Sequence, residues 1–235
     1  MPDLDALKAR AGRWAAEQVA DGMVVGLGSG STAAYAVRTL GERVRAGLRV
    51  VGVPTSQATE ELARTVGIPL ASLDDQPRMD LAIDGADEVD PRLDLIKGHG
   101  GSLLREKLVE LAATRLLIVV DETKLVDTLG ERAALPVEIV PFGWRRTKEA
   151  VEALGCAATL RGGGSPFVTD GGHYILDCRF GSIGQPEQMA ARVKALAGVV
   201  EHGLFLGMAG QVVVARDDGS LEVRHRDARQ NSTYP

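Results

Sequence analysis

Acidic side chains, a lysine and glycine-rich backbone occur together in residues 84–107, which read DGADEVDPRLDLIKGHGGSLLREK. Two of the acids, Asp84 and Asp87, follow a short apolar run. Lys97 precedes the glycines, and Glu106 lies at the start of a segment with helical spacing. Carboxylates, an ammonium group and the N–H groups of a glycine turn are suited to moving protons on a charged, hydroxyl-rich small molecule.

The acids and the lysine also have ordinary structural interpretations. Asp84 and Asp87 could form an acidic surface turn, but Asp84 directly follows an expected strand, at the sheet edge where open α/β proteins bind ligands. A calcium loop is disfavoured because Ala86 breaks the alternation of acids that such a loop requires. The residues leave magnesium binding by the two acids open. Lys97 ends an apolar pair, and a lysine buried there needs a partner such as an anionic substrate.

Glu106 has two interpretations that the sequence alone leaves open. The apolar stripe of its helix is expected to consist of leucines, at Leu104, Leu108 and Leu111. Because Glu106 points away from this stripe, it is either a solvated glutamate favoured by the helix N-terminus or a base in an enclosed cleft. Its neighbours Arg105 and Lys107 are expected to be surface charges.

The stretch 26–32, GLGSGST, joins an expected strand to an expected helix, an arrangement that offers N–H groups and a positive helix end to an anion. A dinucleotide site is disfavoured, because Ser31 replaces the third glycine of that fingerprint and the next strand ends VGVPTS without an acid. The stretch also lacks the Gly-Lys-Ser/Thr ending of a Walker loop. The hydroxyls of Ser31 and Thr32 either bind a phosphate or a sugar hydroxyl, or they only cap the helix.

Three further features are weighed against structural roles. His99, between glycines, is interpreted as a loop residue. Lys124 follows an apolar strand and is either a phosphate ligand or a surface lysine. The segment 161–166, RGGGSP, is not followed by a helix, so we interpret it as a flexible hairpin loop rather than a phosphate cradle.

Composition restricts the class of protein. The chain has 235 residues, 45% of them hydrophobic and 25% charged, which is ordinary for a globular protein. The net charge of −5 gives no basic footprint, so nucleic acid and membrane surfaces are not expected as partners. No apolar run reaches the ~18 residues of a membrane span, and no secretory signal pattern is present. Cys156 and Cys178 offer neither a disulfide framework nor a paired metal-ligand spacing. We therefore expect a cytoplasmic protein.

The hydrophobic pattern predicts two domains. Apolar strands alternate with helices in the first part of the chain, which indicates a mostly parallel α/β sheet covered on both faces. The expected strands are 23–27, 48–53, 68–73, 81–83 and 116–120, and the expected helices are 4–19, 33–44, 57–66 and 103–113. Residues 131–203 follow the order βαββαβ of a ferredoxin-like α+β domain. The strands 204–206, 212–214 and 221–223 are assigned to the first domain or to the join, which gives domains of 1–130 with 204–235, and 131–203.

Seven segments of the chain, in their order, resemble signature segments of one known family, the A type of ribose-5-phosphate isomerase. They are GLGSGSTA, GVPTS, DGADEVD, KGHGGSLLREK, DETK, LPVEI and GLFLGMA. The combination is specific, although no single segment is. The resemblance implies an open Rossmann-like sheet with a ferredoxin-like second domain, in agreement with the pattern above.

The same resemblance implies an aldose–ketose isomerase of the non-oxidative pentose phosphate pathway. It would interconvert ribose 5-phosphate and ribulose 5-phosphate through a cis-enediolate, without cofactor or metal, and as a homodimer. Glu106 would be the catalytic base, and Asp84, Asp87 and Lys97 would also take part in catalysis. The implied substrate-binding positions are Ser29, Gly30, Ser31, Thr32, Asp84, Gly85, Ala86, Asp87, Lys97, Gly98, His99, Gly100 and Lys124.

Two other functions are weighed against this one. A non-catalytic sugar-phosphate sensor would use the same kind of fold, but it needs an output module for which the single expected N-terminal helix leaves no room. An enzyme similar to CoA-transferases would use a glutamate as nucleophile. Formation of ketose from ribose 5-phosphate alone discriminates among the three.

Overall fold

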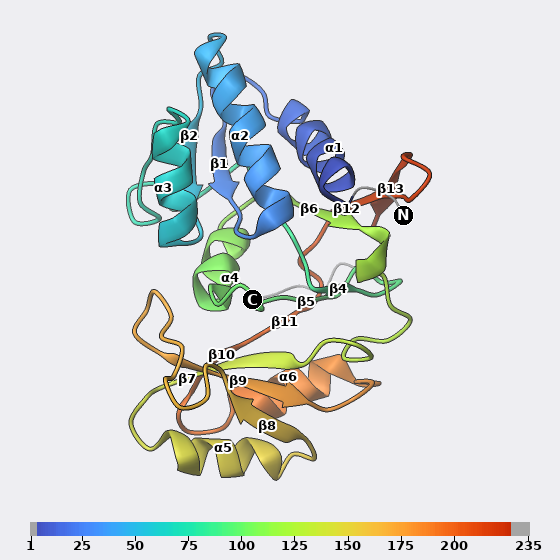
Figure 1. The fold of residues 1–235 in the computed structure, drawn as a ribbon. Helices are drawn as coiled ribbons and strands as arrows, with labels where there is room; N and C mark the ends of the chain where they lie inside the picture. Colours follow the sequence, from blue (N-terminus) through green and yellow to red (C-terminus); the bar gives the residue numbers. More distant parts are fainter. Residues whose placement is uncertain (1–3, 227–235) are drawn as a thin grey trace. The chain divides into compact units, whose positions relative to one another are not determined.

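The computed structural model describes residues 4–226. Their contacts divide the chain into two compact units, each of which is described by itself (Figure 1). The described part of the first unit consists of residues 4–86, 105–124 and 207–226, and the second consists of residues 87–104 and 125–206.

The first unit is built on a six-stranded sheet with the order β13-β12-β6-β3-β1-β2. All neighbouring strands are parallel except β12 and β13. The strands are β1 (Val24–Leu27), β2 (Val51–Pro54), β3 (Leu81–Asp84), β6 (Leu116–Asp121), β12 (Gln211–Ala215) and β13 (Leu221–His225). The expectation of a mostly parallel sheet is therefore confirmed.

Helices cover both faces of this sheet because successive strand residues point to opposite sides. Val25 and Leu27 of β1 pack in one hydrophobic cluster with the first three helices, whereas Val24 lies in another cluster with Val109 of the fourth helix. The helices are α1 (Leu4–Glu17), α2 (Ser31–Arg45), α3 (Gln57–Thr65) and α4 (Leu103–Leu111). Ser56 caps α3, and its hydroxyl accepts a hydrogen bond from the N–H of Thr59 at 3.1 Å.

The expected strand at 68–73 is wrong. Only Leu70 forms a bridge, to Gly52 of the edge strand β2. Pro69 lacks an N–H group, so this apolar run cannot form a continuous ladder. It lies along the edge of β2 without extending the sheet.

The second unit contains a four-stranded antiparallel sheet with the order β10-β7-β9-β8. Its elements are β7 (Leu135–Ile139), α5 (Trp144–Glu152), β8 (Ala157–Leu160), β9 (Tyr174–Arg179), α6 (Pro186–Lys194) and β10 (Val199–His202). The chain order βαββαβ, with the two βαβ halves interleaved, is the ferredoxin-like arrangement that the sequence predicts.

A small three-stranded sheet, β11-β5-β4, explains why the observed units differ from the predicted domains. Its strands are β4 (Glu88–Val89), β5 (Leu95–Ile96) and β11 (Leu204–Phe205). Residues 204–205 therefore pair with the segment 87–104 and join the second unit, while β12 and β13 belong to the first.

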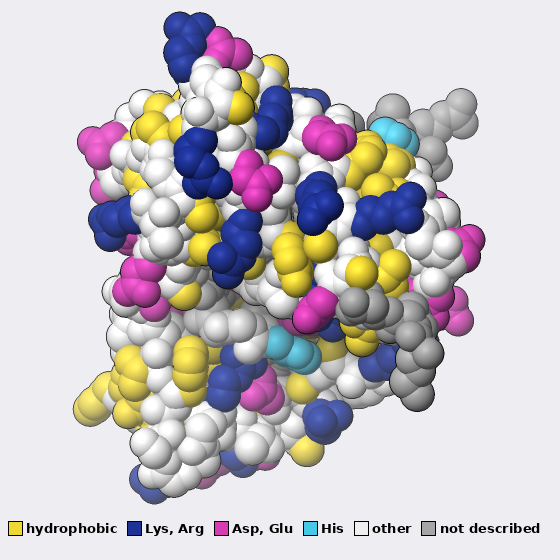
Figure 2. Space-filling model, turned by 45° about the horizontal axis from the view of Figure 1, so that its top comes forward, with side chains coloured by type: hydrophobic (Ala, Val, Ile, Leu, Met, Phe, Trp, Pro, Cys, Tyr) yellow, Lys and Arg dark blue, Asp and Glu magenta, His cyan; other side chains and the backbone are white. Residues whose placement is uncertain are grey.

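No helix within residues 4–226 is both long enough and apolar enough to cross a lipid bilayer. On the face shown in Figure 2, Lys and Arg side chains are interspersed with Asp and Glu side chains.

Candidate active site

The sheet of the first unit has a switch point between β1 and β3. The chain continues from β1 to β2 on one side, whereas β3, β6 and β12 lie on the other side. Open α/β proteins bind ligands beyond the carboxyl ends of the strands at such a point. The loops that leave these ends begin at Gly28, after β1, and at Gly85, after β3.

Asp84 is held between these two loops. Its side chain is 1% exposed, and its Oδ1 accepts hydrogen bonds from the N–H of Ser29 at 3.0 Å and from that of Gly85 at 2.7 Å. The N–H of Gly28 donates to the carbonyl oxygen of Ile83 at 2.9 Å. The structure therefore brings the acid of DGADE directly against the GLGSGST turn.

Gly28 is required for this contact. A Cβ at position 28 would lie 2.3 Å from Cγ of Asp84 and 2.4 Å from the carbonyl oxygen of Ile83. Gly28→Ala is expected to displace Asp84 and to lower the free energy of unfolding by about 1–3 kcal/mol, as measured by chemical denaturation. In the control Gly210→Ala, the added Cβ meets only the carbonyl oxygen of Leu116, at 3.9 Å. Equal unfolding midpoints for both variants and the wild type would contradict this packing.

A cluster of hydroxyl groups surrounds Ser29. Its Oγ lies 2.8 Å from Oγ1 of Thr55, 2.8 Å from Oγ of Ser56 and 3.2 Å from Oγ1 of Thr59. Thr59 in turn donates to the carbonyl oxygen of Gly28 at 3.0 Å. This cluster was not predicted from the sequence, although the segment VPTS at the end of β2 supplies the hydroxyls of Thr55 and Ser56.

The start of α2 excludes one of the two interpretations of Ser31 and Thr32. The N-cap is Gly30, with φ of 93°, and no side chain caps the helix. Ser31 and Thr32 are the first two helical residues, so the interpretation that they only cap α2 is wrong. Their position at a helix N-terminus is one at which an anion is favoured.

α4 buries charged residues and exposes two of the three leucines that were expected to face the core. Glu106 is 4% exposed and Lys107 is 3% exposed, whereas Leu108 is 49% and Leu111 is 44% exposed. Glu110, four residues after Glu106 and hence on the same side of the helix, is also buried. The interpretations of Glu106 as a solvated glutamate and of Lys107 as a surface charge are therefore wrong.

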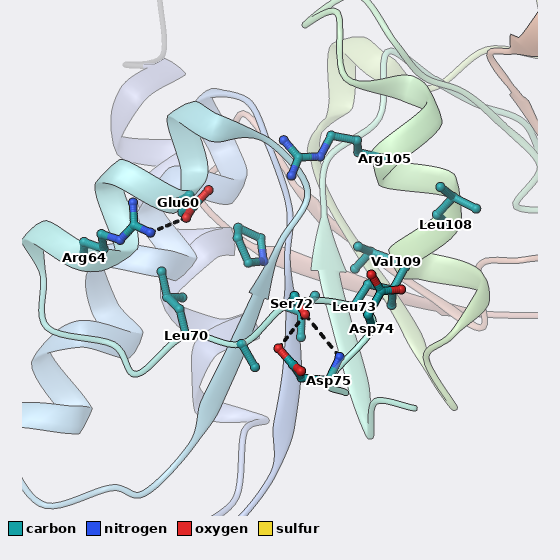
Figure 3. Close-up of a pocket in the computed structure, with 13 residues that line it drawn as sticks. Glu60, Arg64, Leu70, Ser72, Leu73, Asp74, Asp75, Arg105, Leu108 and Val109 are labelled. Atoms are coloured by element: carbon teal, nitrogen blue, oxygen red, sulfur yellow. Dashed lines mark hydrogen bonds and ion pairs between the residues drawn. The ribbon is translucent and has the colours of Figure 1, made fainter. Parts of the chain in front are cut away.

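Leu108, one of the two exposed leucines of α4, borders a hollow within the first unit. The hollow has a volume of about 460 Å³ and lies between α3, the segment 70–75 and α4 (Figure 3). Leu108 and Arg105 line it on one side, and the ion pair between Glu60 and Arg64 lines it on the other. Leu108 is exposed because it faces this hollow, whereas Glu106 and Lys107 of the same helix are buried.

Lys124 comes from a third neighbouring strand. It ends the short 3₁₀ helix η1 (Glu122–Lys124), which directly follows β6, and it is half-buried. Because β6, β3 and β1 are adjacent and parallel, the segments that carry Lys124, Asp84 and Ser29 leave the same edge of the sheet.

In the second unit, the pairing of β4 with β5 connects Asp87 to the glycine loop. The N–H of Asp87 donates to the carbonyl oxygen of Ile96 at 2.8 Å, and Oδ2 of Asp87 accepts from the N–H of His99 at 3.0 Å. Lys97 is 3% exposed, and its Nζ lies 5.5 Å from the centroid of the Phe205 ring. Lys97 is therefore a buried cation that lies over an aromatic face.

The glycine loop 97–101 has a backbone that requires glycine. Gly98 and Gly101 have φ of 111° and 88°, and a Cβ on Gly98 would lie 2.8 Å from the Leu103 side chain. The N–H groups of Gly98 and Gly100 donate to no residue within 4–226. Nε2 of His99 lies 3.1 Å from the carbonyl oxygen of Ala134, a contact that helps to hold the loop.

Glu88, the third acid of DGADE, has a structural role. It is 1% exposed and accepts hydrogen bonds from three backbone N–H groups. They belong to Gly130 at 2.6 Å, Arg132 at 2.8 Å and Ala133 at 2.6 Å. Glu88 therefore fixes the loop that precedes β7.

The predicted residues are thus distributed over both units. The first unit contains Asp84, Glu106, Lys124 and the segment 29–32, and the second contains Asp87 and the segment 97–100. Direct hydrogen bonds join Ser29 to Asp84 and His99 to Asp87. Within residues 4–226, no group of three or more His, Cys, Asp or Glu side chains is arranged to hold a metal ion.

Several known proteins of similar sequence carry the name of one family. The family model of ribose 5-phosphate isomerase A (phosphoriboisomerase A) matches residues 51–219. Ribose-5-phosphate isomerase A of Gloeobacter violaceus is 59% identical over 94% of this chain and 96% of its own length. The protein of the same name from Synechococcus sp. is 55% identical over 95% of this chain and 99% of its own.

Solved structures agree with the sequence comparisons. Ribose 5-phosphate isomerase from Plasmodium falciparum superposes with a TM-score of 0.92 at 37% identity, over 95% of this chain and 99% of that chain. A D-ribose-5-phosphate isomerase in complex with phospho-erythronic acid gives a TM-score of 0.92 at 39% identity, over 95% of this chain and 100% of that one. The chain therefore belongs to the ribose 5-phosphate isomerase A family.

Proposed function

We propose that this protein interconverts D-ribose 5-phosphate and D-ribulose 5-phosphate by moving a proton between C2 and C1 through a cis-enediolate. The observation that carries the proposal is the burial of Glu106 in the first turn of α4. A glutamate that is withdrawn from water on the charged, buried side of its helix is suited to act as a base. Family membership supplies the substrate and the reaction.

Proton transfer, stabilisation of the developing charge and binding of the sugar hydroxyls are assigned to different residues. Glu106 takes the proton from C2 and returns it to C1, while the hydroxyl proton of O2 passes to O1. The buried ammonium of Lys97, with the N–H groups of Gly98 and Gly100, stabilises the negative charge that develops on the carbonyl oxygen of the open-chain sugar. Asp84 and Asp87 hold hydroxyl groups of the sugar and assist the opening of the furanose ring.

The phosphate group is assigned to the first unit. Ser31 and Thr32 at the N-terminus of α2 offer hydroxyl and N–H donors, and Lys124 adds a positive charge. The complex of a similar isomerase with phospho-erythronic acid supports a phosphorylated ligand of this size. The proposal includes the expected homodimer and its location in the cytoplasm. Light scattering of the purified protein tests whether it is a dimer.

The direct test is incubation of the purified protein with ribose 5-phosphate alone. Ketose is expected to form without nicotinamide, and EDTA is expected to leave the rate unchanged, because the proposed chemistry uses only side chains and backbone. Ribose 5-phosphate deuterated at C2 is expected to react more slowly, because the C2–H bond breaks in the reaction. Binding of the sugar without formation of ketose would contradict the proposal and favour the sensor, and loss of activity in EDTA would contradict the mechanism.

A further inference from the structure

We propose that Arg161 is a positioning residue that sets the orientation of the glycine loop 97–101. The inference rests on the proposed function of that loop. Nη1 of Arg161 donates to the carbonyl oxygens of Gly98 at 2.9 Å and of His99 at 3.0 Å. The same guanidinium donates through Nε to Oδ2 of Asp177 at 3.0 Å and forms an ion pair with that carboxylate. One side chain of the ferredoxin-like sheet therefore holds two consecutive carbonyl groups of the loop.

Arg161 directly follows β8, and its N–H donates to the carbonyl oxygen of Ile175 at 2.9 Å. The alternation of the strand therefore continues to Arg161 and places it on the same face of the sheet as Asp177. Leu160, Leu176 and Cys178 pack in the hydrophobic cluster that contains residues of α5 and α6. Arg161 and Asp177 alternate with these residues, so their side chains lie on the other face. The side chain of Arg161 is 16% exposed and that of Asp177 is 29% exposed, so the pair is partly shielded from water.

The segment RGGGSP completes this arrangement. The N–H of Phe167 donates to the carbonyl oxygen of Arg161 at 2.9 Å, and the guanidinium lies 5.9 Å from the centroid of the Phe167 ring. The same ring packs closely against Gly101, where a Cβ would lie 2.4 Å from Cζ of Phe167. The hairpin loop between β8 and β9 thus contacts both Arg161 and the glycine loop.

Because the peptide bond is planar, a hydrogen bond that fixes a carbonyl group also fixes the direction of the N–H group in the same peptide unit. The carbonyl of Gly98 and the N–H of His99 belong to one peptide unit, which Arg161 holds at the carbonyl and Asp87 holds at the N–H. The carbonyl of His99 and the N–H of Gly100 belong to the next unit. Because C=O and N–H point in opposite directions in a trans peptide, the bond from Arg161 directs the N–H of Gly100 away from the guanidinium. That N–H is one of the donors assigned above to the developing oxyanion.

A general effect of positive charge is the main alternative, and the chain offers a matched control for it. Arg179 lies two residues after Asp177 on β9, on the same face, and lines the same hollow of about 520 Å³ as Arg161 and His99. Unlike Arg161, Arg179 forms no side-chain hydrogen bond or ion pair within the part of the chain that the structure describes. Removal of Arg179 therefore removes one charge from the hollow and leaves the loop contacts intact.

The test compares Arg161→Met, Arg161→Lys and Arg179→Met in the full chain. We expect Arg161→Met to lower kcat by about 10²-fold with a smaller change in KM, because a small displacement of catalytic groups has an effect of that size. Arg161→Lys keeps the charge but not the planar fork, and it should recover only part of kcat. Arg179→Met should stay within about twofold of the wild type.

Amide hydrogen exchange supplies a readout that is independent of activity. In Arg161→Met, the bonded N–H groups of His99 and Gly101 are expected to exchange faster, while those of β7 and β9 keep their protection. If Arg161→Met does not fold, Asp177→Asn is the second variant, because it keeps the guanidinium but removes its ionic anchor. It should lower kcat and speed exchange at His99 to a smaller extent.

Three results would overturn the inference. They are an equal loss of kcat in Arg179→Met, faster exchange spread evenly over the whole second unit, and unchanged exchange of the loop in Arg161→Met and Asp177→Asn. A wild-type protein that forms no ketose would instead contradict the proposed function. The exchange measurement would then still decide whether Arg161 holds the loop.

Discussion

Glu106→Gln is expected to abolish turnover, with kcat lowered by about 10²- to 10⁴-fold. Glutamine has the shape of glutamate but cannot accept the proton from the sugar carbon. Because the substitution leaves the other proposed contacts with the sugar phosphate in place, the dissociation constant should change by less than about tenfold. Steady-state kinetics gives kcat, and titration calorimetry with ribose 5-phosphate gives the affinity of the inactive variant.

The same helix provides the control for this prediction. Glu110 lies one helical turn after Glu106 and is also buried, at 3% exposure. Glu110→Gln is expected to change kcat by less than about threefold, since the proposed chemistry gives it no proton to transfer. Wild-type turnover in Glu106→Gln would remove Glu106 as the base. An equal loss in both variants would assign the effect to the packing of α4.

Lys97→Met is expected to lower kcat by about 10²- to 10³-fold, the usual effect of losing one donor to a developing oxyanion. The ammonium of Lys97 is buried over the Phe205 ring, so it acts where few water molecules weaken its field. Lys97→Arg should not restore kcat, because the larger planar guanidinium cannot occupy the position of a compact ammonium. Lys148→Met is the control, because Lys148 pairs with Glu152 on α5 of the same unit, at 2.7 Å.

The kinetic constants of Lys97→Met also separate two roles for the lysines. If Lys97 stabilises the oxyanion, most of the loss is in kcat. A rise in KM with unchanged kcat would show that Lys97 binds ground-state substrate, as a phosphate ligand does. Lys124 would then be the remaining lysine for the oxyanion, and the proposed assignment of the two residues would be reversed.

The parallel sheet was predictable because its strands carry an unusually direct signal. The runs 81–83 and 116–120 are apolar at every position, a pattern typical of strands that are covered on both faces. Once these strands are placed, Asp84 and Lys124 necessarily fall at their carboxyl ends. The GLGSGST turn follows β1 for the same reason, so the position of Asp84, Lys124 and this turn at one edge of the sheet follows from chain order.

The buried face of the helix that carries Glu106 was not predictable in the same way. Leucine spacing suggested that Leu104, Leu108 and Leu111 face the core, but Leu108 and Leu111 are exposed and Glu106 and Lys107 are buried. Helical periodicity reports the buried face only when that face is apolar. It fails where a protein turns charged residues inward, and such departures from local rules are expected at functional sites.

The contacts that hold the glycine loop were also beyond local sequence reasoning. Arg161 and the carbonyl oxygen of Gly98 are separated by 63 residues. Nothing near either residue signals the pairing, which depends on the register of β8 with β9 and on the return of the hairpin loop at Phe167. The sequence shows the glycines that permit the turn, whereas the side chain that selects its orientation comes from a distant element.

The position of β12 in the sheet has a consequence for how the protein is made. β12 (Gln211–Ala215) lies between β6 and β13, so the inner strand β6 gains its second neighbour only after residues 125–210 have been synthesised. During translation on the ribosome, β6 (Leu116–Asp121), which is buried along its whole length in the finished protein, therefore has an open edge. We therefore expect the nascent first unit to be prone to aggregation until β12 has emerged and docked.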